Sequence, residues 1–321
     1  TYDNQFNGVE AINYDTKITF SYTALDKYFS CPFNYYLKYV LGIEEFEETL
    51  NLTLGNLIHE IFSHQYEDGF DFDKTFDNYL SSLTLSKKDR FFVSKLKDSF
   101  KLASEAAREH INKYSAESTL FLEKELSYTI DENTVLIGKV DKIVTLDNRY
   151  FYVVDYKTGS KTFTFNHIEN GKDTQLVIYS ILCENFEELD NLTLGGLYIN
   201  YVSPTELTLS SSDEEKIIPS YLKLKGPSLR DNNYLLRADK TFVGASQASF
   251  INGIRLKNDG SLHAKSTCIS TDEFEQYKNT VKELIRKANA SIRENDFKIA
   301  PKFYGKNGPC QYCNFKDICF K

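Results

Sequence analysis

Two hydrophobic periodicities divide this chain of 321 residues. Over 54–65, 70–115, 175–186 and 271–296, apolar side chains recur at helical spacing, which predicts amphipathic helices. The period changes to two over 121–130 and 134–146, and an apolar, aromatic run follows at 150–157. Polar turns at 131–133 and 147–149 separate these stretches, so they predict three successive strands of one sheet.

The alternation of helical and strand patterns, with a further short strand at 195–203, predicts an α/β fold. Residues 1–17 show no clear period and are predicted to be a connector. Residues 18–321 are predicted to form a single domain, in which the polar, irregular range 203–267 is an insertion. The chain contains no GxxxxGK[ST] motif, which argues that it is not itself an ATPase.

Composition narrows the class of protein. With 41% hydrophobic residues, the chain is expected to bury a large core. Its formal net charge of −8 weakens a nucleic-acid hypothesis without excluding it, because a basic groove can coexist with a carboxylate-lined metal site. No apolar run is long enough for a bilayer and no signal peptide is evident, so we expect a cytoplasmic protein. The absence of Met, even at position 1, suggests a fragment of a longer chain or the omission of modified residues.

Candidate chemistry begins at the end of the third strand, which reads YFYVVDYK before Thr158 and Gly159. Side chains alternate along a strand, so Asp155 and Lys157 point the same way. An isolated Asp-x-Lys pair is most often a structural ion pair. Asp141, however, lies inside the preceding strand, and a bound cation is the most economical explanation for two acids on adjacent core strands.

Three further side chains could contribute to such a site. His59 lies on the helix predicted over 54–65, where an ordinary partly buried histidine is the simpler interpretation. Gln175 and Tyr179 are four apart and share a helical face, so they could touch a ligand or steer Lys157, or simply lie on the surface.

Four of the six cysteines have the spacing of metal ligands: Cys31 near the start, and Cys310-x2-Cys313-x5-Cys319 at the end. In an intracellular protein this spacing points to metal or redox chemistry and not to a disulfide framework. Four thiolates suit a [4Fe–4S] cluster and suit structural zinc equally well.

Taken in order, these motifs resemble the PD-(D/E)xK nuclease superfamily, and within it the RecB-like nuclease domain of the AddB subunit of AddAB-type helicase–nucleases. The resemblance rests on FSCPFNYYLKYV, GNLIHEIF, GKVDKIV, VVDYKTG, QLVIYS and CQYCNFKDIC, and covers nearly the whole chain. It implies a restriction-endonuclease-like core, with a central mixed sheet flanked by helices. The chain departs from the family pattern GxxDRxD, because Lys142 replaces the arginine and Val144 replaces the final acid.

The resemblance implies a deoxyribonuclease that depends on Mg²⁺ or Mn²⁺ and degrades single DNA strands produced by a helicase during recombinational repair. His59, Asp141, Asp155 and the backbone carbonyl of Tyr156 would hold one or two ions. Asp141 and Asp155 would act in catalysis together with Lys157, which would act on the attacking water, and with Gln175 and Tyr179, which would position the phosphate or Lys157. Glu123 resembles an acid that some relatives place near the metal.

The resemblance also implies that Cys31, Cys310, Cys313 and Cys319 ligate a structural [4Fe–4S] cluster, which staples the N-terminal helix to the C-terminal tail. The implied partners are DNA, an AddA-type subunit and the remainder of a longer chain. Two alternatives stay open: a freestanding iron–sulfur exonuclease of the CRISPR-associated kind, and a catalytically inactive DNA-binding scaffold.

Overall fold

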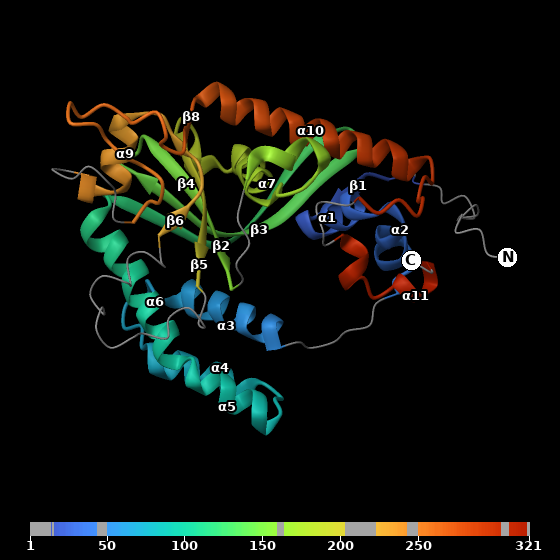
Figure 1. Ribbon diagram of the computed structural model, residues 1–321, viewed down its shortest axis with the longest axis horizontal. Helices are drawn as coiled ribbons and strands as arrows, with labels where there is room; N and C mark the ends of the chain where they lie inside the picture. Colours follow the sequence, from blue (N-terminus) through green and yellow to red (C-terminus); the bar gives the residue numbers. More distant parts are fainter. Residues whose placement is uncertain are drawn as a thin grey trace.

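The structure, a computed structural model, describes residue 14 and residues 16–43, 50–158, 164–202, 223–242, 250–302 and 308–319. Among these residues, eight strands form one mixed sheet in the order β1-β3-β4-β5-β7-β8, with β2 paired to β3 and β6 paired to β5 (Figure 1). The strands are β1 Ile18–Phe20, β2 Ser118–Asp131, β3 Thr134–Leu146, β4 Tyr150–Lys157, β5 Thr193–Tyr201, β6 Leu224–Lys225, β7 Ser228–Leu229 and β8 Cys268–Ile269. The mixed sheet with flanking helices confirms the α/β fold expected from the sequence.

The helices fall on either side of this sheet. They are α1 Tyr22–Ser30, α2 Pro32–Tyr35, α3 Leu50–His64, α4 Phe72–Ser82, α5 Lys87–Lys95, α6 Lys97–Glu109, α7 Gln175–Leu182, α9 Asn232–Ala238, α10 Thr271–Arg293 and α11 Lys316–Cys319. Short 3-10 or π turns span Tyr36–Val40, His110–Tyr114, Phe165–Asn170, Cys183–Asn185, Glu187–Leu189, Lys240–Phe242 and Pro309–Tyr312. Among the described residues, no helix has the length and apolar character that crossing a membrane requires.

The three predicted strands form an antiparallel meander, β2-β3-β4. Its second turn is built by Asp147 and Asn148, which both adopt the left-handed backbone conformation, with φ of 48° and 50°. Asp and Asn tolerate this conformation better than most residues, so the local sequence favours a tight reversal here. Strand β5 then joins β4 in parallel, which places the ends of β4 and β5 at the same edge of the sheet.

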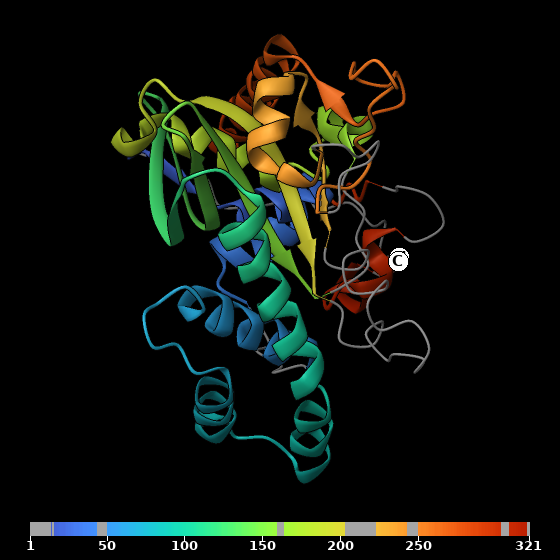
Figure 2. The ribbon, with the colours of Figure 1, turned by 90° about the vertical axis from the view of Figure 1, so that its left-hand side faces the viewer.

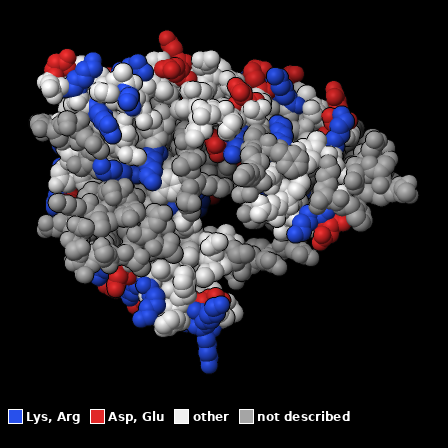
Figure 3. Space-filling view, viewed as in Figure 1, with Lys and Arg blue, Asp and Glu red and all other residues white. Residues whose placement is uncertain are grey.

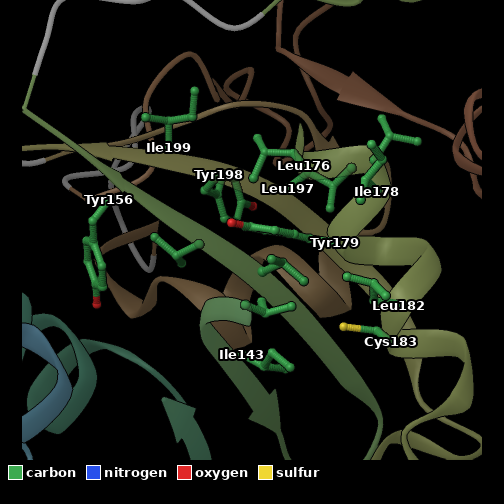
Figure 4. Packing of buried hydrophobic residues seen from close by; sticks show 14 of the residues in the cluster. Ile143, Tyr156, Leu176, Ile178, Tyr179, Leu182, Cys183, Leu197, Tyr198 and Ile199 are labelled. Atoms are coloured by element: carbon green, nitrogen blue, oxygen red, sulfur yellow. The ribbon is translucent and has the colours of Figure 1, made fainter. Parts of the chain in front are cut away.

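Helices α7 and α3 approach the sheet from opposite faces. Every residue of α7 from Leu176 to Leu182 is buried, because α7 lies between the sheet and the long helix α10 (Figures 1 and 4). The ring of Tyr156 points away from α7, as Figure 4 shows, and meets the ring of Phe62 on α3 at 4.6 Å between centroids. Helices α4 to α6, predicted from the pattern at 70–115, project from the sheet as a helical arm (Figure 2).

The two ends of the described chain lie side by side, since α1, α2 and α11 form one group in Figure 1. The predicted connector 1–17 lies outside the described residues except for Tyr14, Thr16 and Lys17. Of the predicted insertion, 203–222 and 243–249 also lie outside them, while β6 and β7 pair with β5. The domain boundaries remain predictions.

Candidate active site and cysteine cavity

The candidate site forms where β3 and β4 separate. The last pair of their antiparallel ladder is Lys142 opposite Val154, so Asp141 and Asp155 stand opposite each other one step beyond it. Paired residues of neighbouring strands share a face of the sheet, and the two carboxylates therefore project together. Both are buried, with exposed fractions of 5% and 1%. The backbone N–H of Tyr156 donates to Asp141 Oδ2 at 2.8 Å, which fixes this carboxylate.

Asp155 is the centre of one group of side chains. Lys157 Nζ lies 3.0 Å from its Oδ1 and 2.8 Å from its Oδ2. From the first turn of α7, the Gln175 Nε2 amide donates to Asp155 Oδ1 at 2.7 Å and to the Tyr179 hydroxyl at 2.9 Å. The structure thus brings four of the side chains predicted as catalytic into one hydrogen-bonded group.

Asp141 belongs to a second group, which includes His59 on α3. His59 Nδ1 lies 3.0 Å from Glu123 Oε1 and 3.8 Å from Asp141 Oδ1. Among the described residues, His59, Glu123 and Asp141 are the set whose possible ligand atoms all lie within 4.8 Å of one another. His59 and Asp141 were predicted as metal ligands. Asp155, also predicted, is not part of this compact set, and the carbonyl of Tyr156 remains a predicted ligand.

Glu123 owes its place to an unusual backbone. It has φ of 47° in the middle of β2, while the β2–β3 ladder continues on both sides. For a residue other than glycine this left-handed conformation costs about 1–3 kcal/mol, and such strain tends to occur at functional sites. The carboxylate reaches His59 and also pairs with Lys139 Nζ at 2.6 Å. From the sequence, only the family resemblance pointed to this residue, because an acid in a strand carries no sign of a left-handed backbone.

Burial disfavours the charged form of both aspartates in the pocket. Burial, and secondly the charge of Asp155, raise the pKa of Asp141 to about 7. Burial also raises the pKa of Asp155, although Lys157 opposes this. Burial would lower the pKa of His59, but its hydrogen bond to Glu123 and the charge of Asp141 outweigh burial and raise that pKa. A divalent cation would favour the charged carboxylates, so the donor set fits a metal ion chemically.

A cavity of about 310 Å³ lies between the two ends of the chain, and all four predicted cluster ligands line it. They are Cys31, Cys310, Cys313 and Cys319. Asn34 donates its side-chain amide to Cys313 Sγ at 3.3 Å, so one sulfur atom accepts a hydrogen bond. No disulfide joins any of the six cysteines, all of which are described. Unlike the group around Asp141, no three of these sulfur atoms in the described chain lie within 4.8 Å of one another.

Comparison with known proteins decides the family. The sequence pattern of the PD-(D/E)XK nuclease superfamily matches residues 19–320. The chain belongs to this superfamily. The motifs Gly-Lys-Val-Asp and Asp-Tyr-Lys therefore lie in a PD-(D/E)XK nuclease domain, as their resemblance implied.

Curated relatives of this PD-(D/E)XK domain are AddB-type subunits of ATP-dependent helicase/deoxyribonucleases. The protein from Clostridium acetobutylicum is 27% identical over 350 aligned residues, covering 95% of this chain and 30% of that protein. The protein of the same name from Caldanaerobacter subterraneus subsp. tengcongensis is 25% identical over 364 residues, covering 99% and 31%. The Clostridium perfringens protein is 28% identical over 346 residues, covering 94% and 30%. The predicted relationship to AddB subunits is confirmed, and the chain spans about three tenths of these relatives.

The raised pKa of Asp141 should make the stability of the PD-(D/E)XK domain depend both on pH and on bound metal. Because its pKa is raised from 3.8 to about 7 on folding, the metal-free protein should lose stability as pH rises from about 4 to about 7. Mg²⁺ or Mn²⁺ should therefore raise the melting temperature more at pH 8 than at pH 5. Differential scanning fluorimetry of wild type and Asp141→Asn measures this difference, which the substitution should largely remove.

The matched control for this experiment is Glu125→Gln, which neutralises an exposed acid on the same strand as Glu123. It should respond to metal as wild type does at both pH values. An equal metal response in Asp141→Asn and wild type would contradict the assignment of Asp141 to the metal group.

Lys142, at the position where the family pattern has arginine, lies on the opposite face of the sheet. It is 4% exposed, and its Nζ donates to the Tyr66 hydroxyl at 2.7 Å. Burial lowers the pKa of Lys142 to about 7, since no carboxylate of the described residues pairs with it. A buried amine of this kind is a source of instability in the domain.

Lys142→Met is accordingly expected to stabilise the protein, by about 1–4 kcal/mol, because an apolar chain of similar length replaces a buried charge. Tyr66 keeps a partner, since its hydroxyl also donates to the Ala107 carbonyl at 3.3 Å. The cost of Lys142 is full below pH 7 and disappears as pH rises toward 10.5, so the gain should shrink over that range. Urea unfolding of wild type and Lys142→Met at pH 6 and pH 9 measures the gain. If the variant is no more stable than wild type at pH 6, the prediction is wrong.

Proposed function

We propose that this PD-(D/E)XK domain is a metal-dependent deoxyribonuclease that hydrolyses single DNA strands from an end, within a longer helicase–nuclease subunit of the AddB type. The observation that carries the proposal is the convergence of Asp141, Asp155, Lys157 and the His59–Glu123 pair at one end of β3 and β4. The relatives named as helicase/deoxyribonuclease subunits support DNA as the substrate. They also support an AddA-type partner and a longer chain.

Metal binding is assigned to Asp141, His59 and Glu123, with Asp155 facing the same pocket. Carboxylate oxygens suit Mg²⁺ and Mn²⁺, and Mn²⁺ also accepts an imidazole. A bound ion supplies a more acidic water molecule and neutralises charge that grows on the phosphate. Glu123 replaces the third acid that the chain lacks at Val144, so the pocket keeps three carboxylates including Asp155.

The side chains around Asp155 have distinct tasks. Lys157 is 29% exposed at its side chain, so its ammonium can reach a phosphate oxygen or the attacking water while Asp155 holds it. Its positive charge favours the transition state, in which negative charge spreads over the phosphate oxygens. Gln175 bridges Asp155 and Tyr179, and this amide bridge fixes the orientation of the carboxylate.

For the cysteine cavity we propose a [4Fe–4S] cluster. Tetrahedral zinc binds four thiolates at about 2.3 Å, which brings the sulfur atoms to within roughly 3.8 Å of each other. A four-iron cluster binds each thiolate through a different iron, so its ligands stand farther apart. In the described chain no three of the four sulfur atoms lie within 4.8 Å of one another, and they line about 310 Å³ of space, which supports the larger group. Its task would be structural, because hydrolysis transfers no electrons.

A cleavage assay tests the function. End-labelled single-stranded and double-stranded DNA is incubated with purified protein and Mg²⁺ or Mn²⁺, with EDTA as the metal-free control and Asp155→Ala as the site control. We expect wild type alone to degrade the single strand, and only with metal. Equal degradation by wild type and Asp155→Ala would reveal a contaminant. DNA binding without any cleavage would favour the inactive scaffold and overturn the proposal.

A further inference from the structure

A second cavity, of about 370 Å³, lies between the end of β5 and the turn that joins β6 to β7. Its size falls in the range of small-molecule sites. An aromatic ring, a lysine and several hydroxyl groups meet in its wall, and the residues concerned are Phe165, Tyr201, Lys225, Thr164, Ser266 and Thr267. Nothing in the nuclease mechanism above uses this cavity.

The sheet places this cavity beside the candidate active site. In the parallel pairing of β4 and β5, Tyr201 stands opposite Lys157. Paired residues share a face and neighbouring strands are about 4.8 Å apart, so Tyr201 lies one strand away from Lys157 on the active-site face. Burial, and secondly the charge of Asp155, raise the pKa of Tyr201 to about 12, which agrees with this proximity.

Lys225 is the charged group in the cavity wall that is available to a ligand, and it lies against the buried Tyr201. Tyr201 is 6% exposed, and its hydroxyl has no hydrogen-bond partner in the described part of the chain. The hydroxyl oxygen itself is shielded from solvent, so Tyr201 contributes its ring and not its hydroxyl to the cavity wall. Lys225 Nζ lies 4.6 Å above the Tyr201 ring, and no carboxylate of the described residues forms an ion pair with it. An ammonium held in this way is available to an anion.

Phe165 provides a rigid apolar surface. Its ring stacks on Tyr277 of α10 at 3.8 Å between centroids and 6° between planes. This stack covers one face of Phe165 and fixes its orientation, while the side chain still lines the cavity. An aromatic ring held this way loses little conformational freedom when a flat ligand packs against it. In Figure 3, several lysine and arginine side chains lie over the region of β6 and β8.

We propose that this cavity binds one nucleotide of a single DNA strand, next to the phosphate that the active site cuts. Lys225 contacts a phosphate, and the base packs against Phe165. Stacking on an aromatic ring tolerates any base, which suits a nuclease without sequence preference. The inference rests on the proposed nuclease function, and it assigns a position to the strand that this function requires.

Photocrosslinking tests the position of the base. Oligothymidylate that carries 5-iododeoxyuridine is bound to the whole protein in EDTA, which prevents cleavage, and is then irradiated. Mass spectrometry of the crosslinked peptides should find Phe165 or Tyr201. Crosslinks confined to other parts of the chain would overturn the assignment. This is the result expected if a protein segment, and not a nucleotide, occupies the cavity.

Affinity measurements test the phosphate contact. Lys225→Ala should weaken binding of oligothymidylate and reduce the slope of log affinity against log salt by about 0.7, as expected for one lost contact to a single strand. The matched control is Lys257→Ala, an exposed lysine of the same half of the chain outside the cavity wall, which should leave the slope unchanged. Equal slopes in the two variants would overturn the role of Lys225.

Phe165→Leu tests the stacking surface. It should weaken binding of oligothymidylate by about tenfold and binding of an abasic oligonucleotide of equal length much less. Equal losses on both oligonucleotides would overturn the stacking role. If wild type cleaves DNA and these differences are absent, the cavity assignment alone fails. If wild type neither binds nor cleaves DNA, the proposed function fails, and the cavity assignment fails with it.

Discussion

Lys157→Ala is expected to lower the rate of DNA cleavage by about 10²–10⁴-fold, the range for loss of a positioned proton-transfer or charge-stabilising group. Lys157 is the ammonium that the structure places in direct contact with Asp155, and its side chain is partly exposed toward solvent. Substrate must therefore be able to reach it. Single-turnover cleavage of labelled single-stranded DNA at saturating Mg²⁺ measures the loss of the chemical step directly.

Two companion variants make this experiment specific. Lys157→Gln keeps a hydrogen-bond donor for the buried Asp155 but removes the positive charge, so it should be nearly as slow as Lys157→Ala. Lys87→Ala removes the charge of an exposed lysine on α5 and should cleave at the wild-type rate. Because Lys157→Gln keeps a donor for Asp155, its melting temperature should stay close to that of wild type, whereas Lys157→Ala leaves the buried carboxylate without this partner. A Lys157→Gln variant with wild-type activity would show that the charge has no part in catalysis.

Local patterns predicted the centre of this fold well. The β2-β3-β4 meander follows from alternating apolar positions and from turns such as Asp147-Asn148, all within about forty residues. Helices α7 and α10 follow from their own periodicity. By contrast, β6, β7 and β8 have two residues each, too few to show a period. Strands β6 and β7 pair with β5, and β8 pairs with β7, so their places depend on contacts across the sheet that no local pattern reveals.

Some residues of the candidate site could be predicted from the sequence, and others could not. Asp155 and Lys157 were predictable because strand alternation alone places them on one face, and the structure joins them to Gln175. Glu123 could not be deduced from any pattern, since its position depends on a left-handed backbone inside a strand. The cavity of about 370 Å³ could not be predicted either, because Phe165 and Lys225, which both line it, are sixty residues apart in the sequence.

Cys310→Ser is expected to cause the largest loss of stability. Helix α11 has four residues and cannot be stable alone, because an isolated helix needs more than ten. A bound cluster would supply much of the free energy that holds this tail against α1 and α2, since metal-ligand bonds in structural sites contribute directly to folding. Losing one thiolate ligand should therefore lower the melting temperature by at least about 10 °C and lower the soluble yield.

The control for Cys310→Ser is Cys183→Ser, which changes a buried cysteine that does not line the cavity. Wild type and Cys183→Ser, purified without oxygen, should be brown and contain about four iron atoms per chain, whereas Cys310→Ser should be colourless. Zinc in wild type, or equal melting temperatures and iron contents in both variants, would contradict the cluster. The proposed cluster and the carboxylate pocket share no ligand. Cys310→Ser should therefore lower stability directly, and it should lower the cleavage rate only by reducing the amount of folded protein.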